Sequence, residues 1–116
     1  MIAKGSASVK RRAEAAAMRQ LARRAGDAAQ LLKLLGNEKR LLILCFLAVR
    51  GEMTVGNMLD VIDLSPSALS QHLGKLRADG LVVYRRTAQT LHYRVVDPRA
   101  LRVLQALKKI YCGDIK

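Results

Sequence analysis

The stretch from Leu64 to Thr87 constrains the fold more than any other part of the chain. Ser65 and Pro66 are typical of a helix start, because a serine oxygen can accept from a free backbone N–H and proline has no N–H to leave unpaired. Gly80 is typical of a helix end. Between these signals, three leucines recur at spacings of four and three: Leu69, Leu73 and Leu76. The pattern predicts a helix with one buried face.

The opposite face of this helix carries short polar side chains. Such groups near a helix N-terminus can reach base edges in the major groove of DNA, while the first N–H groups approach phosphate. We therefore predict that Ser67, Ser70 and Gln71 contact bases and that Lys75 contacts phosphate. His72 lies near the buried edge of the helix, where a structural role and a contact to the DNA backbone are equally consistent with its position.

The residues just before this helix supply its partner in a helix-turn-helix. Thr54 can cap a helix, and apolar residues then repeat at i, i+3, i+4 and i+7: Val55, Met58, Leu59 and Ile62. Residues 63–65 make a turn of the length that this motif requires.

A basic β-hairpin is predicted after the second helix. An apolar run over residues 82–84 leads into Arg85 and Arg86, and residues 90–96 alternate as a returning strand. We predict that Arg85, Arg86 and Gln89 contact DNA from this hairpin. The alternative is an amphipathic surface helix beside an ordinary hairpin. The agreement of cap, spacing, turn and basic hairpin favours a winged helix-turn-helix.

The net charge points to a polyanionic partner. Twenty-one Lys and Arg residues against nine Asp and Glu give +12, which suits DNA, RNA or an anionic membrane. One Phe, three Tyr and no Trp are too few for the stacking platforms of single-stranded RNA binders, so RNA is the weaker prediction. No apolar run has the length of a membrane span, and the N-terminus shows no signal-peptide core. We therefore expect a cytoplasmic protein without a membrane partner, whose two cysteines are thiols.

At 116 residues the chain is expected to hold one domain, residues 27–116, preceded by a basic arm, residues 1–26. The arm has seven Lys and Arg residues against one Glu, which is half of the net charge. Its first ten residues are expected to be disordered, and its Ala-rich composition favours helix from Arg11 onward. Both a solvated tail and an arm that tracks phosphates fit this composition. A capping-box pattern at residues 27–30 predicts a helix start there, with Gly36 as the stop.

Two further helices complete the predicted domain. Asn37 caps one whose residues 41–49 are apolar at every position, so we expect this helix to be buried on all sides with Cys45 inside the domain. Asp97 caps the last helix, whose broad apolar stripe predicts a contact in a dimer. Cys112 lies in its final turn.

The predicted fold is mainly α with a small β-hairpin wing, in the order helix, helix, helix, helix, strand, strand, helix. No Gly-rich phosphate loop or paired-carboxylate motif is present, and His72 and His92 stand apart in the sequence. The apolar surroundings expected for Cys45 would raise its pKa and make it a poor nucleophile. We therefore predict neither an enzyme nor a cofactor site.

With these residues in view, residues 28–112 resemble the ArsR/SmtB family of dimeric winged-helix repressors. The resemblance rests on three motifs: LLKLLGNEKRLLIL, TVGNML and SALSQHLGKLRADGLV. It implies a transcriptional repressor that binds a double-stranded DNA operator as a homodimer. Many members sense metals, but Thr54 stands where that family often has a cysteine ligand. Of the ligands at the C-terminal helix only Asp97 matches, with Arg99 following, so we predict no metal site.

The positions of Cys45 and Cys112 resemble the sulfide- and persulfide-responsive branch of that family. This resemblance implies that reactive sulfur species join the two thiols through a disulfide or polysulfide bridge, that DNA is released, and that sulfide-detoxification genes are expressed. Each cysteine could instead be a small buried hydrophobe, and a separation of 67 residues says nothing about distance. A metal-responsive repressor and a non-sequence-specific nucleoid or RNA-binding protein are the alternative functions.

Overall fold

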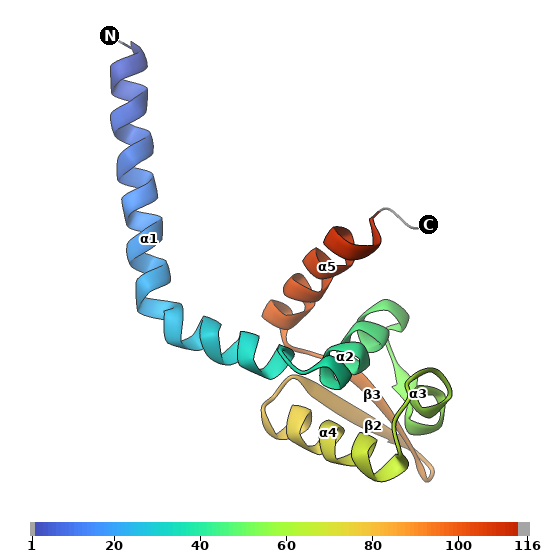
Figure 1. The fold of residues 1–116 in the computed structure, drawn as a ribbon. Coiled ribbons are helices and arrows are strands. Elements are labelled where there is room, and N and C mark those ends of the chain that lie inside the picture. The colour runs from blue at the N-terminus through green and yellow to red at the C-terminus, as the bar shows by residue number, and fades with distance from the viewer. Residues whose placement is uncertain (1, 114–116) are drawn as a thin grey trace. The chain divides into compact units, whose positions relative to one another are not determined.

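The structure, a computed structural model, describes residues 2–113 of the chain. Met1–Lys33 form one compact unit and Leu34–Lys116 form another. The elements follow in the order α1 (Ile2–Leu35), α2 (Glu38–Arg50), β1 (Met53–Thr54), α3 (Val55–Val61), α4 (Pro66–Ala78), β2 (Val82–Thr87), β3 (Thr90–Val95) and α5 (Pro98–Cys112) (Figure 1). The predicted fold class is confirmed, because the chain is mainly helical and a small antiparallel hairpin follows the helix-turn-helix.

α1 is a single helix where the sequence predicts disorder over the first ten residues, helix from Arg11 onward, and a helix start or restart at Asp27. Residues 2–10 are helical, and the helix continues through the alanines of residues 15–17, which have the highest helix propensity. Asp27 lies inside this helix, where the N–H groups that a cap would bind are already used by the preceding turn. Its carboxylate accepts a hydrogen bond from Arg24 Nε at 3.2 Å instead. The predicted helix start at Asp27 is therefore wrong.

α2 carries apolar residues on two faces, and only one of them is buried. Asn37 caps the helix as predicted, with Oδ1 accepting from two backbone N–H groups at 3.1 Å. The buried face consists of Ile43, Leu44 and Leu47. The other face, the outer stripe, follows the i, i+3, i+4, i+7 spacing and consists of Leu42, Cys45, Phe46 and Val49.

The prediction that α2 is buried on all sides is wrong. Cys45 and Phe46 are half-buried, Leu42 is exposed, and Val49 is 64% exposed. Within residues 34–113, β3 and α5 are the elements that pack most extensively against α2. An all-apolar helix therefore does not by itself establish burial within one chain.

The sheet has three antiparallel strands in the order β1-β3-β2. β1 was not predicted from the sequence, because a strand of only two residues is too short to show an alternating pattern. Met53 lies opposite Tyr93, and Tyr93 in turn lies opposite Tyr84. Since side chains alternate between the faces of a sheet, this row of residues shares the face that is buried in the core. The row on the other face contains Thr54, His92 and Arg85.

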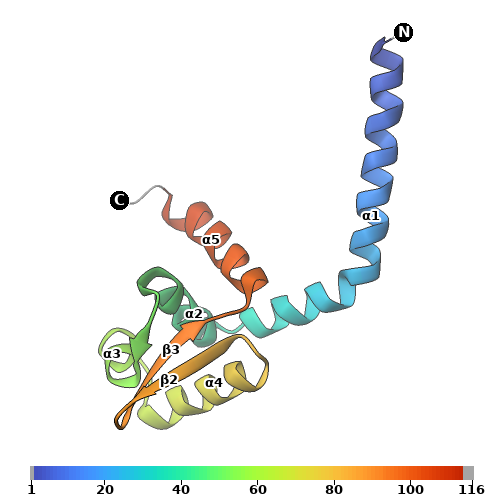
Figure 2. The same cartoon turned by 180° about the vertical axis from the view of Figure 1, so that it is seen from behind.

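The helix-turn-helix is confirmed. Thr54 Oγ1 caps α3 by accepting from Asn57 N at 3.1 Å, and the turn before α4 ends at Ser65, whose Oγ accepts from Ala68 N at 3.1 Å. α4 lies alongside β2, as both views of the ribbon show (Figures 1 and 2). The predicted core leucines of α4, Leu69, Leu73 and Leu76, are all buried. α5 begins at its predicted cap, Asp97.

Two glycine replacements should change stability in opposite directions. Gly80, just after α4, has a φ of +79°, and a Cβ built there meets no atom within 4 Å. Gly80→Ala should therefore destabilise the protein through the backbone alone, by about 1–2 kcal/mol. Gly74 lies inside α4 with equally open space, so Gly74→Ala should stabilise by about 0.5–1 kcal/mol. Urea unfolding measures both free energies, and changes of the same sign would contradict this assignment.

Candidate nucleic-acid interface

The polar face of α4 is built by the burial of its leucines. With Leu69, Leu73 and Leu76 turned into the core, Ser67, Ser70 and Gln71 are exposed together over the first half of the helix. Ser65 and Pro66 start the helix, so its free N–H groups lie at the same end. The structure thus brings the three predicted base-contacting residues onto one exposed face.

The side chains that flank the polar face of α4 differ in the contacts that they make within the protein. Lys75 is exposed, and its Nζ lies 3.5 Å from Asp79 Oδ2, an exposed pair one turn apart that can open at little cost. His72 is half-buried, at the edge predicted for it. The Arg77 guanidinium stacks over the Tyr84 ring at 4.7 Å and so joins the end of α4 to the base of the hairpin.

The hairpin ends in an exposed, polar tip. Thr87 and Thr90 face each other across the turn, and Ala88 within it has a φ of +56°. Arg86 and Gln89 are exposed. Among the described residues no hydrogen bond or ion pair engages the Arg86 side chain. Arg86 and Gln89 are therefore available to an external partner.

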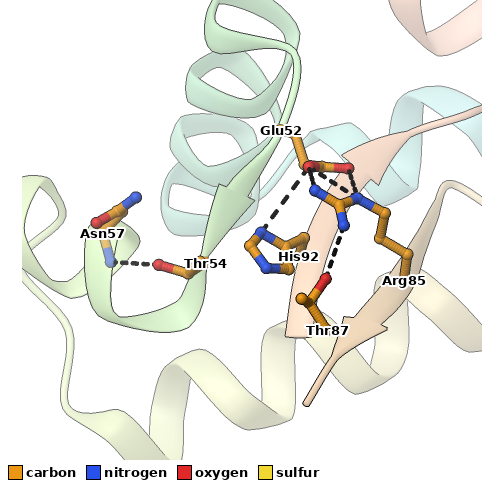
Figure 3. Close-up of polar contacts among 6 residues, drawn as sticks. All are labelled: Glu52, Thr54, Asn57, Arg85, Thr87 and His92. Atoms are coloured by element: carbon orange, nitrogen blue, oxygen red, sulfur yellow. Dashed lines mark hydrogen bonds and ion pairs between the residues drawn. The ribbon is translucent and has the colours of Figure 1, made fainter. Parts of the chain in front are cut away.

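Arg85 is held by the protein itself (Figure 3). Its Nε lies 3.1 and 3.0 Å from the two carboxylate oxygens of Glu52, its Nη2 donates to Glu52 Oε1 at 2.7 Å, and its Nη1 donates to Thr87 Oγ1 at 2.8 Å. The hydrogen bonds from Arg85 hold the pKa of the Glu52 carboxyl below its ordinary value. The sequence did not single out Glu52, because only the pairing of β1 with β3 brings it near the hairpin.

The two cysteines lie on neighbouring helices. Cys45 belongs to the outer stripe of α2 and Cys112 to the last turn of α5; α2 and α5 pack against each other, and both cysteines are free thiols. Partial burial, and then the charge of the Cys112 thiolate, raise the pKa of the Cys45 thiol. Cys45 is half-buried, not inside the domain as expected, and Cys112 is exposed.

Two properties of residues 2–113 bear on other partners. No three His, Cys, Asp or Glu side chains in that range gather closely enough to hold a metal ion. No helix in the same range combines the length and the apolar character needed to cross a membrane.

Comparison with known proteins assigns the family. The family model described as "Bacterial regulatory protein, arsR family" matches residues 37–84, from the cap of α2 into β2. The transcriptional activator HlyU of Vibrio cholerae is 40% identical over 95 residues, which cover 82% of this chain and 87% of HlyU. The chain belongs to the ArsR family. The resemblance in the sequence is thereby confirmed at the level of an ArsR-family DNA-binding transcriptional regulator.

Other ArsR-family relatives extend the likeness. The biofilm growth-associated repressor of Agrobacterium fabrum is 41% identical over 91 residues, covering 78% of this chain and 77% of the repressor. The solved structure described as reduced HlyU from Vibrio cholerae superimposes with a TM-score of 0.75 at 40% identity, covering 81% of this chain and 98% of the other. The relatives thus include both an activator and a repressor.

The thiols of this ArsR-family regulator should differ in reactivity. At pH 8 a neutral maleimide should modify exposed Cys112 faster than Cys45, because burial and a raised pKa leave Cys45 with less accessible thiolate. Mass spectrometry of tryptic peptides follows the modification of both sites. Equal rates at Cys45 and Cys112 would contradict this difference in accessibility.

Proposed function

We propose that this regulator is a homodimeric repressor that binds a double-stranded operator and releases it when persulfide or another reactive sulfur species oxidises Cys45 and Cys112. The observation that carries the proposal is that α2 and α5, which pack against each other, each carry a free thiol and lie in the same unit that presents α4. The genes released from repression would be those of sulfide detoxification, and the protein would act in the cytoplasm, where its DNA is.

α4 and the hairpin supply the proposed DNA contacts. Small polar side chains at the start of a helix suit base edges, so Ser67, Ser70 and Gln71 would enter the major groove. Four flanking side chains would contact the DNA backbone: His72, Lys75, Arg86 and Gln89. The exposed serines and glutamine, which need no rearrangement to become accessible, support this arrangement.

An exposed apolar surface supports the proposed homodimer. The outer stripe of α2 and the end of α5 both expose apolar side chains, and on α5 Ile110 is 69% and Tyr111 is 82% exposed. A second copy that covered this surface would remove apolar area from water. Two-fold symmetry would then present two α4 helices, one to each half-site of the operator.

In the proposed oxidation, one persulfide molecule balances the atoms and electrons. A cysteine thiol attacks the outer sulfur of RSSH, which forms a protein persulfide and releases RSH. The second thiol attacks the inner sulfur of that protein persulfide, which forms the Cys45–Cys112 disulfide and releases H₂S. The dithiol loses two electrons, and the transferred sulfur is reduced to sulfide. Exposed Cys112 is the proposed site of first attack, because Cys45 is partly shielded and its pKa is raised.

The proposed Cys45–Cys112 bridge would weaken DNA binding by changing the positions of helices. It would tie α2 to α5 and change the separation or tilt of the two α4 helices. If the oxidised state disfavours DNA by about 1–3 kcal/mol, the affinity falls roughly 5- to 150-fold, and bound DNA opposes oxidation by the same amount.

The direct test is fluorescence anisotropy on labelled duplex DNA from upstream of the protein's own gene. The reduced protein should bind this duplex more tightly than a shuffled duplex, and an organic persulfide should release it. Cys45→Ser and Cys112→Ser should bind as the reduced protein does and fail to release. Release from the Cys112→Ser protein would contradict the dithiol mechanism.

Two controls separate the alternative functions. Release by zinc and not by persulfide would show a metal-responsive repressor. Equal binding to the shuffled duplex would show a nucleoid-type protein, and preference for single-stranded RNA would show an RNA-binding protein.

The salt dependence of binding tests the proposed phosphate contacts. Lys75→Gln and Arg86→Gln should each reduce the slope of log affinity against log salt by about one per protomer. Lys108→Gln is the matched control, because Lys108 is an exposed lysine on α5, an element separate from α4 and the hairpin. This substitution should leave the slope unchanged. A reduced slope in the control and not in Lys75→Gln would move the DNA-binding surface to α5.

A further inference from the structure

An ion pair crosses the sheet and reaches the hairpin at Arg85, which lies opposite His92. Glu52 immediately precedes β1, Arg85 belongs to β2, and β3 lies between these strands in the sheet. Figure 3 shows the carboxylate and the guanidinium facing each other above His92, whose Nδ1 lies 3.8 Å from Glu52 Oε1. The contact therefore ties an edge segment to the hairpin over the middle strand.

The geometry occupies every nitrogen of the guanidinium. Nε and Nη2 face the two Glu52 oxygens, and Nη1 faces the Thr87 hydroxyl. Such a forked arrangement is directional, whereas a lysine ammonium could supply only a point charge. A DNA phosphate could take over the Nε and Nη2 fork of this guanidinium only by displacing Glu52.

Arg86, the next residue of β2, differs from Arg85 in its direction and in its partners. Successive side chains of a strand point to opposite faces, so Arg85 and Arg86 leave β2 in different directions. Both are exposed, but only Arg85 has an acidic partner among the described residues. The two arginines are therefore suited to different tasks.

The segment that carries Glu52 also starts the helix-turn-helix. Met53 follows it and is buried, and Thr54 then caps α3 through its bond to Asn57 N, which Figure 3 also shows. Because Met53 and Thr54 are fixed by the core and by this cap, Glu52 is attached to a rigid point. The ion pair consequently links the hairpin to the beginning of α3.

We propose that Glu52 is a positioning residue that holds the wing against the helix-turn-helix through Arg85, so that Arg86, not Arg85, is the wing's phosphate contact. This inference rests on the proposed DNA-binding function for its consequence, but the link itself exists without DNA. It gives Arg85 a task within the fold in place of the DNA contact expected from the sequence.

The first test needs no DNA. Hydrogen exchange of the amides in β2 and β3 should be about fivefold faster in Glu52→Gln and in Arg85→Lys, the effect of losing one well-formed exposed ion pair. Arg85→Lys keeps the charge and loses the fork, so it isolates geometry from charge. Arg86→Lys is the control and should exchange as the natural protein does. Unchanged exchange in Glu52→Gln and Arg85→Lys would overturn the proposal.

The second test uses a charge-balanced pair of substitutions. Glu52→Gln with Arg85→Gln removes one negative and one positive charge, so the net charge stays the same. On the upstream duplex this variant should bind about fivefold more weakly, with the salt slope of the natural protein. A slope reduced by about one per protomer would make Arg85 a phosphate contact and overturn the proposal, as would an unchanged affinity.

The two tests separate this inference from the proposed function. If the natural protein does not distinguish the upstream duplex from a shuffled one, the operator-binding proposal fails, and the exchange rates still decide whether Glu52 holds the hairpin. Far-ultraviolet circular dichroism and thermal unfolding of each variant verify that the fold is retained, so that a change in exchange confined to β2 and β3 reports on the hairpin alone.

Discussion

The burial of three leucines on one face of α4 is the constraint on which the proposed DNA-binding surface depends. Leu69, Leu73 and Leu76 are fully or almost fully buried, and their removal from water fixes the rotation of the helix about its own axis. That rotation leaves the serines and glutamine of the opposite face outside. The stacking of Arg77 over Tyr84 then holds the end of the helix to the hairpin. The chemistry offered to DNA is thus a consequence of packing inside the domain.

The parts of the fold that could be predicted are those with local signals. The caps at Asn37, Ser65 and Asp97 lie where expected, because a capping side chain acts on N–H groups only two or three residues away. The spacing of the leucines in α4 is likewise a local property of one helix. Helix boundaries and the buried face of α4 therefore follow from the sequence, whereas the break expected near Asp27 was overridden by alanine-rich neighbours.

The parts that could not be predicted depend on contacts between distant residues. Glu52 and Arg85 are brought together by strand order, and no spacing in the sequence shows that β1 pairs with β3. The exposure of the outer stripe was not predicted, because an apolar residue type does not show whether another part of the same chain will cover it. The packing of α2 against α5, the helices that carry Cys45 and Cys112, is likewise a contact between segments far apart in the sequence.

The central claim, that α4 enters the major groove, is tested most directly by dimethyl sulfate protection of the bound upstream duplex. This reagent modifies guanine N7, which lies in the major groove. The account predicts protected guanines in two clusters about one helical turn, roughly 10 base pairs, apart, with protection lost at specific guanines in Gln71→Ala. Tight binding that leaves every guanine N7 reactive would contradict it, because the protein would then hold DNA without entering the major groove.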